Sequence, residues 1–325
     1  MSVDFSVIVC THNRSASLHA TLQSLAGLQA PGDLAWEALV VDNGSTDRTA
    51  ETAAGFRPAL PILRYLYEPE KGLSRARNAG IRRARGSVLA FLDDDVRVDP
   101  RWLQALRDAY RRYPAACVSG RVLLAPELCR PAWWDARFDA PLGKFDRGSS
   151  VMLSTQAGGA LLGIGANISF RRDVFERHGL FRTDLGRQGS KLLMGEETEL
   201  CARLRRHGEL IVHYPDALVL HAPDVTRFTK GYVRRWYFRI GEWRAPEVLQ
   251  AEEHLPRILG VPRWRYRQAL ADAAATLRHA CAGRRDAAFV HQVAVVEFLG
   301  TLSAALRRRA AREASPPAAA PVAHR

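Results

Sequence analysis

The chain has 325 residues, 47% of them hydrophobic, so it is long enough to bury a substantial core in one large domain or two small ones. Its formal charge of +13 and its pI of about 10.1 indicate an anionic partner: nucleic acid, anionic lipid or a phosphorylated substrate. The five cysteines form no C-x-x-C pair, which argues against a disulfide framework and favours a reducing cytosol.

Three apolar segments in the first hundred residues each end abruptly in polar residues, as buried strands do when they leave a core. The segments and their polar ends are 5–9 with 10–14, 38–41 with 42–47, and 88–92 with 93–95. Leucines at helical spacing follow the first of them. Strands and helices that alternate in this way predict βαβ units and a parallel sheet, so the three polar ends are expected at one edge.

The third polar end consists of three consecutive carboxylates, Asp93, Asp94 and Asp95. Carboxylates packed side by side repel each other, and a divalent cation removes that repulsion. Oxygen ligands of this kind suit Mg²⁺ or Mn²⁺. The alternative is a solvated acidic turn after a strand.

Six segments of the chain together resemble the family 2 glycosyltransferases, inverting enzymes of the GT-A fold that use nucleotide-sugar donors. The matching segments are 7–14, 41–47, 72–80, 91–95, 165–172 and 195–201. They occur in the family's order, and the resemblance covers about residues 3 to 245. It implies an α/β GT-A fold, a mostly parallel sheet flanked by helices, to which a C-terminal helical appendix is added.

The resemblance also implies a donor site. Thr11 and Asp42 are expected to read the nucleobase, and a carboxylate can accept the imide N–H of uracil or thymine, which favours a UDP or dTDP sugar. Asp42 has a plainer interpretation as a turn residue before a helix. The nucleotide-sugar residues are Thr11, Asn13, Arg14, Asp42, Arg77, Asp93 and Asp94. The metal ligands are Asp93, Asp95 and His221, although a lone histidine after a strand is often structural.

An inverting transfer needs a base that removes the proton of the acceptor hydroxyl. The family's acidic pair falls on Glu196 and Glu197; Glu197 is the candidate base, and Glu196 stays open as the alternative. Acidic residues in a first helical turn also complement the helix dipole, which is the structural alternative. Gly165, Ala166 and Asn167 belong to a glycine-rich segment expected to lie against the sugar or acceptor, unless it is a bulged core strand.

The C-terminal third is basic and helical. Phe228, Tyr232, Trp236 and Ile240 recur at helical spacing among arginines, which predicts a membrane-surface helix or an amphipathic helix packed on the catalytic domain. Alanine-rich helices are expected over 268–282 and 287–306. No apolar run reaches the roughly 18 to 20 residues of a membrane span. Asp4 interrupts the start of the chain, so no secretory leader is expected.

These observations predict a catalytic domain over 1–225, with a nucleotide-sugar half to about 120 and an acceptor half from about 121. A basic amphipathic helical region over 226–310 and a disordered tail over 311–325 follow. The expected activity is metal-dependent inverting transfer to a glycan or lipid-linked acceptor, in the cytoplasm or peripherally on the inner face of the cell membrane. The alternatives are a basic nucleic-acid-binding protein, for which no binding motif is visible, and a non-catalytic nucleotide-sugar-binding homologue.

Overall fold

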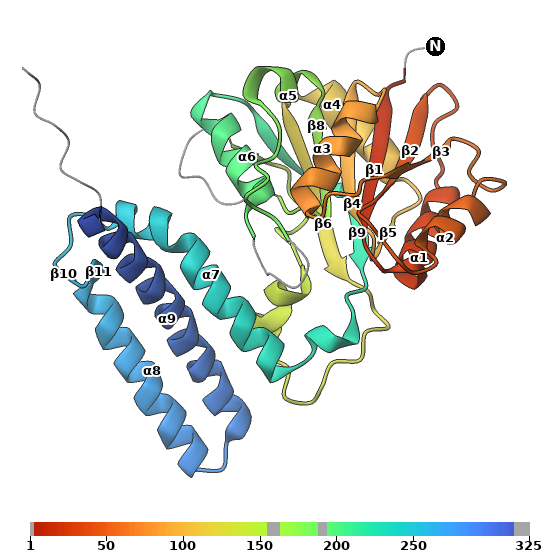
Figure 1. The fold of residues 1–325 in the computed structure, drawn as a ribbon. Helices are drawn as coiled ribbons and strands as arrows, with labels where there is room; N and C mark the ends of the chain where they lie inside the picture. Colours follow the sequence, from red (N-terminus) through yellow and green to blue (C-terminus); the bar gives the residue numbers. More distant parts are fainter. Residues whose placement is uncertain (1–2, 155–162, 188–193, 315–325) are drawn as a thin grey trace, which may run out of the picture. The chain divides into compact units, whose positions relative to one another are not determined.

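The computed structural model describes residues 3–154, 163–187 and 194–314 (Figure 1). The chain divides into two compact units. The first comprises residues 1–130 and 137–225, and the second comprises 131–136 and 226–325.

The first unit is built of alternating strands and helices. Its elements in the N-terminal part are β1 (Phe5–Thr11), α1 (Ser15–Ala26), β2 (Trp36–Asp42), α2 (Thr49–Gly55), β3 (Leu63–Tyr67), α3 (Leu73–Arg83), β4 (Val88–Asp93), β5 (Val96–Val98) and α4 (Trp102–Arg112). They continue with β6 (Cys117–Leu124), the 3-10 helix η1 (Ala136–Leu142), β7 (Met152–Ser154), β8 (Asn167–Arg171), α5 (Asp173–His178), α6 (Glu196–Arg206) and β9 (Ile211–His221).

One sheet of nine strands runs through this unit in the order β3-β2-β1-β4-β8-β6-β9-β5, with β7 paired to β9. The strands β3, β2, β1 and β4 are parallel, and Thr11 lies in register with Asp42 while Cys10 lies in register with Asp93. The predicted parallel sheet and its shared polar edge are therefore confirmed. β8 runs antiparallel between β4 and β6, so the sheet is mixed beyond β4.

Side chains on the two faces of the sheet form separate cores because successive residues of a strand point to opposite sides. On one face, Val7 and Val9 pack with leucines of α1 and with Trp102 of α4. On the other face, Ile8 packs with alanines of α3 and with Leu200 of α6. Helices thus cover both faces, which accounts for the near-continuous burial of β1, β2 and β4.

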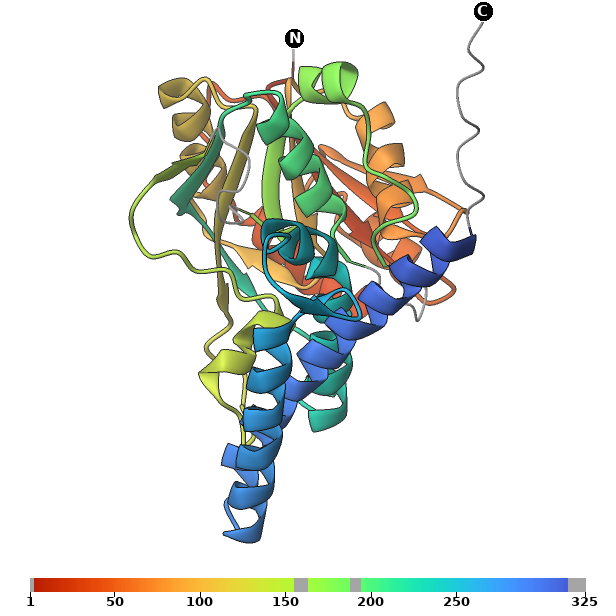
Figure 2. The same ribbon diagram turned by 90° about the vertical axis from the view of Figure 1, so that its left-hand side faces the viewer.

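The second unit is a bundle of three helices. It contains α7 (Lys230–Ala251), the short strands β10 (Arg257–Ile258) and β11 (Val261–Pro262), α8 (Arg263–Cys281) and α9 (Arg285–Ala314). The 3-10 helix η2 (Val225–Arg227) spans the boundary between the two units, because its first residue belongs to the first unit. Within this unit α9 packs against both α7 and α8 (Figure 2). The backbones of α7 and α9 come very close: a Cβ added to Gly241 would lie 2.1 Å from the Glu297 carbonyl oxygen, and one added to Gly300 2.0 Å from that of Phe238.

The predicted helix exists; of its expected apolar residues Phe228 and Tyr232 are buried, whereas Trp236 and Ile240 are half-buried. Tyr232, Val233, Ala245 and Leu249 of α7 are buried, and Ala245 and Leu249 share a small core with Ala304 of α9. The α9 helix continues to Ala314, beyond the expected end of the helical region at 310, because alanine and arginine favour helix. The rest of the predicted tail, 315–325, lies outside the described residues.

The α9 segment Arg285–Ala310 is long and apolar enough, by length and composition, to cross a membrane: its mean hydropathy is 1.5 and one third of the most apolar window is buried. This differs from the expectation that no segment would qualify, since a few polar residues interrupt the run without lowering its average. A helix that packs between two others meets the same criterion, because both situations favour apolar residues on most sides.

Candidate active site

The carboxyl ends of β1, β2 and β4 place Thr11, Asp42 and Asp93 at one edge of the first unit. Arg14, at the start of α1, reaches the same edge. Its guanidinium donates to Asp94 Oδ1 and Asp95 Oδ2, each at 2.8 Å. The loop after β1 and the loop after β4 are thus joined by one guanidinium that makes a charge-assisted hydrogen bond to each of two carboxylates.

Asp94 and Asp95 are almost fully buried, whereas Asp93 is 36% exposed. The Thr11 hydroxyl donates to Asp94 Oδ2 at 2.6 Å. Burial raises the pKa of Asp94 to about 7 against the opposing effect of Arg14, and the neighbouring Asp95 raises it further. Of the three aspartates, Asp93 is the one most open to a ligand from solvent.

His221, the last residue of β9, faces this cluster. Its Nδ1 lies 2.5 Å from the Leu142 carbonyl oxygen and its Nε2 lies 2.8 Å from Asp95 Oδ1. A carbonyl can only accept, so Nδ1 carries the hydrogen, and in the neutral ring the lone pair of Nε2 points at a carboxylate. Two acceptors at this distance need a proton or a cation between them. A backbone carbonyl on Nδ1 is also the usual way in which proteins orient a metal-binding histidine.

Asp93, Asp95 and His221 each offer one ligand atom, and these atoms lie within 4.8 Å of one another. Two carboxylates and one imidazole suit Mn²⁺, and Mg²⁺ with more reluctance, because magnesium prefers oxygen alone. Gly143 supports this cluster from outside. It has a φ of +78°, and a Cβ there would lie 2.8 Å from the His221 ring.

Asp42 is held by its own surroundings. The Tyr65 hydroxyl donates to its Oδ2 at 2.6 Å, and the backbone N–H of Ser45 donates to its Oδ1 at 2.8 Å. The turn interpretation is therefore realised, and a carboxylate keeps further lone pairs for a ligand. Asn13 also fastens a loop, since its Oδ1 accepts the Thr46 N–H at 2.7 Å.

Arg77 lies among carboxylates and is 3% exposed. Its Nη1 donates to Glu196 Oε1 at 2.8 Å and lies 3.7 Å from Glu197 Oε2, while its Nη2 lies 3.8 Å from Asp93 Oδ1. One guanidinium thus connects the acidic pair on α6 with the aspartates after β4. The sequence placed Arg77 at the nucleotide, and the structure places it between these two groups of acids.

Glu196 and Glu197 differ in their environments. Burial, and next the charge of Glu197, raise the pKa of Glu196 to about 8. Burial acts in the same direction on Glu197, but Arg77 and hydrogen bonds from Glu196 and the Gly165 N–H lower the pKa of Glu197. The two pKa values are thus shifted in opposite directions, which favours Glu196 over Glu197 as the holder of a shared proton. Glu197 Oε2 is buried and has no hydrogen-bond partner among the described residues.

The glycine-rich segment touches the acidic pair through its backbone. The Gly165 N–H donates to Glu197 Oε1 at 3.0 Å. A Cβ on Gly165 would lie 2.1 Å from Arg77 Nη2, so a larger residue there would displace the Arg77 guanidinium. Ala166 and Asn167 are buried.

The side chain of Asn167 points away from the expected ligand. Its amide donates to the Ala217 carbonyl at 2.7 Å and accepts from the Trp102 indole at 2.9 Å, which ties β8 to β9 and α4. The register shift that the structure shows lies in β6, between Ser119 and Arg121. A Cβ on Gly120 would collide with the Asn167 amide, at 2.2 Å.

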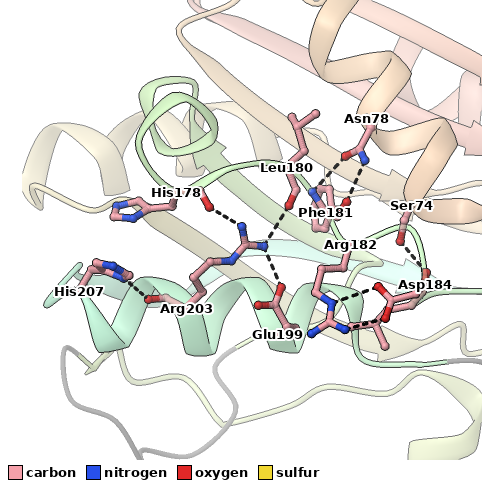
Figure 3. Close-up of polar contacts among 11 residues, drawn as sticks. Ser74, Asn78, His178, Leu180, Phe181, Arg182, Asp184, Glu199, Arg203 and His207 are labelled. Carbon is pink, nitrogen blue, oxygen red and sulfur yellow. Dashed lines mark hydrogen bonds and ion pairs between the residues drawn. The ribbon is translucent and has the colours of Figure 1, made fainter. Parts of the chain in front are cut away.

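A network that the sequence did not predict holds the acidic pair in place (Figure 3). Arg203 of α6 donates to the carbonyls of His178 and Leu180 and pairs with Glu199. Asn78 of α3 donates to the Phe181 carbonyl at 2.9 Å and accepts the Phe181 N–H at 3.1 Å. The segment after α5 therefore joins α3, which carries Arg77, to α6, which carries both glutamates. The only sequence signal was that Asn78 directly follows Arg77.

A model of the family described as "Glycosyl transferase family 2" matches residues 6–179. The succinoglycan biosynthesis protein ExoM of Rhizobium meliloti is 30% identical over 236 residues, 72% of each chain. The glucosyl-dolichyl phosphate glucuronosyltransferase of Haloferax volcanii is 28% identical over 221 residues, 66% of this chain and 68% of that protein.

Solved structures share the fold. The mannosyltransferase PcManGT from Pyrobaculum calidifontis, in complex with GDP-Man and Mn²⁺, matches with a TM-score of 0.56 at 21% identity, over 98% of this chain and 77% of its own. S. aureus TarS 1-349 in complex with UDP matches with a TM-score of 0.54 at 16% identity, over 94% of this chain and 92% of its own. Both agree with the α/β arrangement of the first unit.

Proposed function

Because this chain belongs to glycosyl transferase family 2 and is a glycosyltransferase of glycan or glycolipid synthesis, we propose that it transfers a sugar with inversion from a nucleoside-diphosphate sugar to an acceptor hydroxyl. The single observation that best supports this proposal is the position of Glu197: its buried Oε2 accepts no hydrogen bond from the described residues and lies 3.7 Å from Arg77, which also approaches Asp93 at the sheet edge.

The donor binds at the carboxyl ends of β1, β2 and β4. Asp42, oriented by Tyr65, accepts an N–H of the base, and a UDP or dTDP donor is favoured because those bases carry an imide N–H. Thr11 and Arg14 hold Asp94, and either Asp94 or the more exposed Asp93 contacts the ribose. Asn13 shapes the loop that surrounds the nucleotide.

Asp93, Asp95 and His221 would hold a divalent cation, Mn²⁺ in preference to Mg²⁺. When bound, the cation supplies Lewis-acid stabilisation of the negative charge that develops on the departing diphosphate. The chain's own part is to orient the ligands: Leu142 fixes the His221 ring and Arg14 fixes Asp95. Asp93 is exposed enough to meet both donor and solvent.

Glu197 acts as the base, taking the proton of the acceptor hydroxyl at Oε2 as that hydroxyl attacks the anomeric carbon. Protonated Glu196 and the Gly165 N–H position the Glu197 carboxylate through hydrogen bonds. Arg77 keeps Glu197 ionised and holds it at a fixed distance from Asp93. We therefore assign Arg77 to the acidic pair in place of the nucleobase.

The acceptor is a glycan or a lipid-linked sugar, as the name of the Haloferax volcanii relative suggests. The enzyme acts in the cytoplasm, peripherally on the inner face of the cell membrane. The basic second unit supports this location, since residues 226–325 contain 18 Arg or Lys against 8 Asp or Glu.

The test uses paired variants of the two glutamates. Glu197→Gln keeps the shape of the side chain but cannot take up a proton, so turnover should fall by roughly 10² to 10⁴ while donor affinity survives. Donor binding is followed by calorimetry with UDP, dTDP and GDP in the presence of Mn²⁺, and turnover by release of the nucleoside diphosphate. If Glu196→Gln loses turnover in this way and Glu197→Gln stays active, the base has been assigned to the wrong residue.

A further inference from the structure

The outward side of α8 carries a row of exposed residues spaced alternately by four and three. We call these residues the α8 face: Arg263, Arg267, Leu270, Ala274, Leu277 and Cys281. Leu270 is 71% exposed and Leu277 67%, more than any other leucine of the described residues. Such spacing puts all six on one side of a helix.

The opposite side of α8 already has its partner within the bundle. Tyr266 packs edge to face on Phe298 of α9 at 5.1 Å, and Asp272 lies 2.8 Å from His291 of α9. Ala275 of α8 is buried as well. The α8 face therefore plays no part in the packing of the second unit. Its two exposed leucines are available to bind another surface.

The positive charge of the α8 face limits which kinds of partner it can bind. Arg263 and Arg267 lie at one end of the α8 face, and Arg278, Arg284 and Arg285 lie at or just beyond its other end; none has an ion pair among the residues that the structure describes. The one acid of α8, Asp272, faces α9. A second copy of the chain, parallel or antiparallel, would set arginines against arginines, which is unfavourable.

The two leucines at the centre of the α8 face favour a bilayer over a nucleic acid as its partner. Two exposed leucines gain nothing from contact with a phosphate backbone, and the nearby Tyr266 packs on Phe298, so its ring is not available for stacking on a base. At the surface of an anionic bilayer, leucines enter the acyl boundary while arginine heads remain among the lipid phosphates. Both kinds of side chain on the α8 face then find a partner.

We propose that the α8 face docks the enzyme on anionic lipid bilayers. The proposal refines the membrane location given above and rests on it, but it does not involve the transfer site. It also moves the contact from the predicted helix near residues 228–240, whose side chains Tyr232 and Val233 are buried in α7, to a helix whose apolar residues are free.

Flotation with vesicles of phosphatidylglycerol and phosphatidylcholine, compared with phosphatidylcholine alone, tests this proposal on the full chain. Leu270→Gln/Leu277→Gln should weaken binding to the anionic vesicles by about tenfold or more, and Arg263→Gln/Arg267→Gln by about tenfold to thirtyfold. The matched controls lie on the first unit: Leu153→Gln, at a leucine 55% exposed, and Arg57→Gln/Arg206→Gln, at two exposed arginines. They should bind as the wild type does.

A second measurement reads the contact directly. Cys129 and Cys281 are the two exposed cysteines of the described chain, so a Cys129→Ser variant can be labelled at Cys281 with an environment-sensitive dye. Anionic vesicles should shift its emission to the blue, and excess duplex or single-stranded DNA should not displace them. No shift, unchanged binding by the leucine variant, or a dimer that the leucine variant converts to monomer would overturn the proposal.

The same proteins are titrated with UDP and Mn²⁺. Unaltered nucleotide binding by the leucine variant, together with lost vesicle binding, supports the α8 face independently of the transfer site. Failure of the proposed function would instead appear as absent nucleotide binding in the wild type, whatever its behaviour on vesicles.

Discussion

Arg14 contacts one carboxylate oxygen of Asp95 and His221 contacts the other, so these two residues fix the orientation of the carboxylate. Replacing this acid by the isosteric asparagine has two opposing effects on the fold, because it weakens the contact with Arg14 and also relieves repulsion with Asp94. The same loss takes away one of the three candidate ligand atoms. The residue therefore contributes to binding more than to stability.

Asp95→Asn should abolish Mn²⁺-dependent binding of the donor nucleotide and leave the free energy of unfolding within about 1 kcal/mol of the wild type or slightly above it. Calorimetry with and without Mn²⁺ measures the first effect, and urea unfolding the second. Asp99→Asn, a change of an acid outside the cluster, is the control. Metal-dependent binding that persists in Asp95→Asn would show that the cation is held elsewhere.

Glu196 makes stability depend on pH. Its pKa of about 8 in the folded chain exceeds the ordinary 4.5, so the folded state binds the proton more tightly. The stabilisation is complete below pH 4.5 and is lost as pH rises toward 8, by at most about 1.4 kcal/mol per pH unit. Glu196→Gln cannot ionise and should flatten this dependence.

The measurement is the difference in unfolding free energy between wild type and Glu196→Gln at pH 5 and pH 8. Asp94 titrates in an overlapping range, with a pKa of about 7, but it is present in both proteins and its effect cancels. Wild type should lose stability relative to the variant as pH rises. An equal dependence in both proteins would contradict the assignment of the shared proton to Glu196.

Single residues were predicted well where strand ends fix their place. Asp93 follows a strand whose neighbours are set by the βαβ pattern, so its position at the edge could be read from the sequence. The orientation of the Asn167 side chain could not be predicted from the sequence. Its amide fits into the core only because Gly120, which is distant in sequence, has no side chain. The Leu142 carbonyl that orients His221 gives no sequence signal at all, since any residue has one.

At the scale of helices, α7 and α9 are held together by their glycines. A backbone-to-backbone approach of this kind requires a residue without a Cβ on each helix, and Gly241 and Gly300 supply it. Helical periodicity predicted both helices, but an amphipathic pattern does not reveal whether its apolar side meets a membrane or another helix. The partner α9 lies about sixty residues later in the chain, beyond the reach of a local pattern.

Gly241→Ala should destabilise the second unit by about 1–3 kcal/mol, because the added methyl group collides with the Glu297 carbonyl. The same helix offers a matched control: a Cβ on Gly231 meets only the end of the Arg235 side chain, at 3.7 Å. Gly231→Ala should be neutral or stabilising by up to about 1 kcal/mol. Urea unfolding followed by circular dichroism compares them, and equal effects of the two changes would contradict the close crossing.

At the scale of the whole molecule, the two units have separate cores and different surface charge. Residues 226–325 carry ten of the thirteen net positive charges, whereas the acidic pair and the aspartates lie in the first unit. The overall charge of the chain was therefore a poor guide to its substrate, because most of the net charge comes from the second unit. The donor site had to be inferred from sequence motifs.

Nucleotide binding should stabilise only the first unit. With UDP and Mn²⁺ at about 100 times the dissociation constant, its free energy of unfolding should rise by about 2.7 kcal/mol. Scanning calorimetry should then show one shifted transition and one that stays in place. Asp95→Asn serves as the control, with no shift in either. A single transition that moves as a whole would show that the two units unfold together.

The order in which the sheet can form follows from the strand pairing. Strand β1 pairs with β2 and β2 pairs with β3, so these consecutive strands can assemble early, whereas β4 pairs with β1, from which it is distant in sequence. His221 ends β9, which pairs with β6 and β5 and is the last strand of the sheet in chain order. A truncated or half-folded chain has its aspartates but lacks the histidine. The group of Asp93, Asp95 and His221 is therefore complete only once β9 has paired with the sheet.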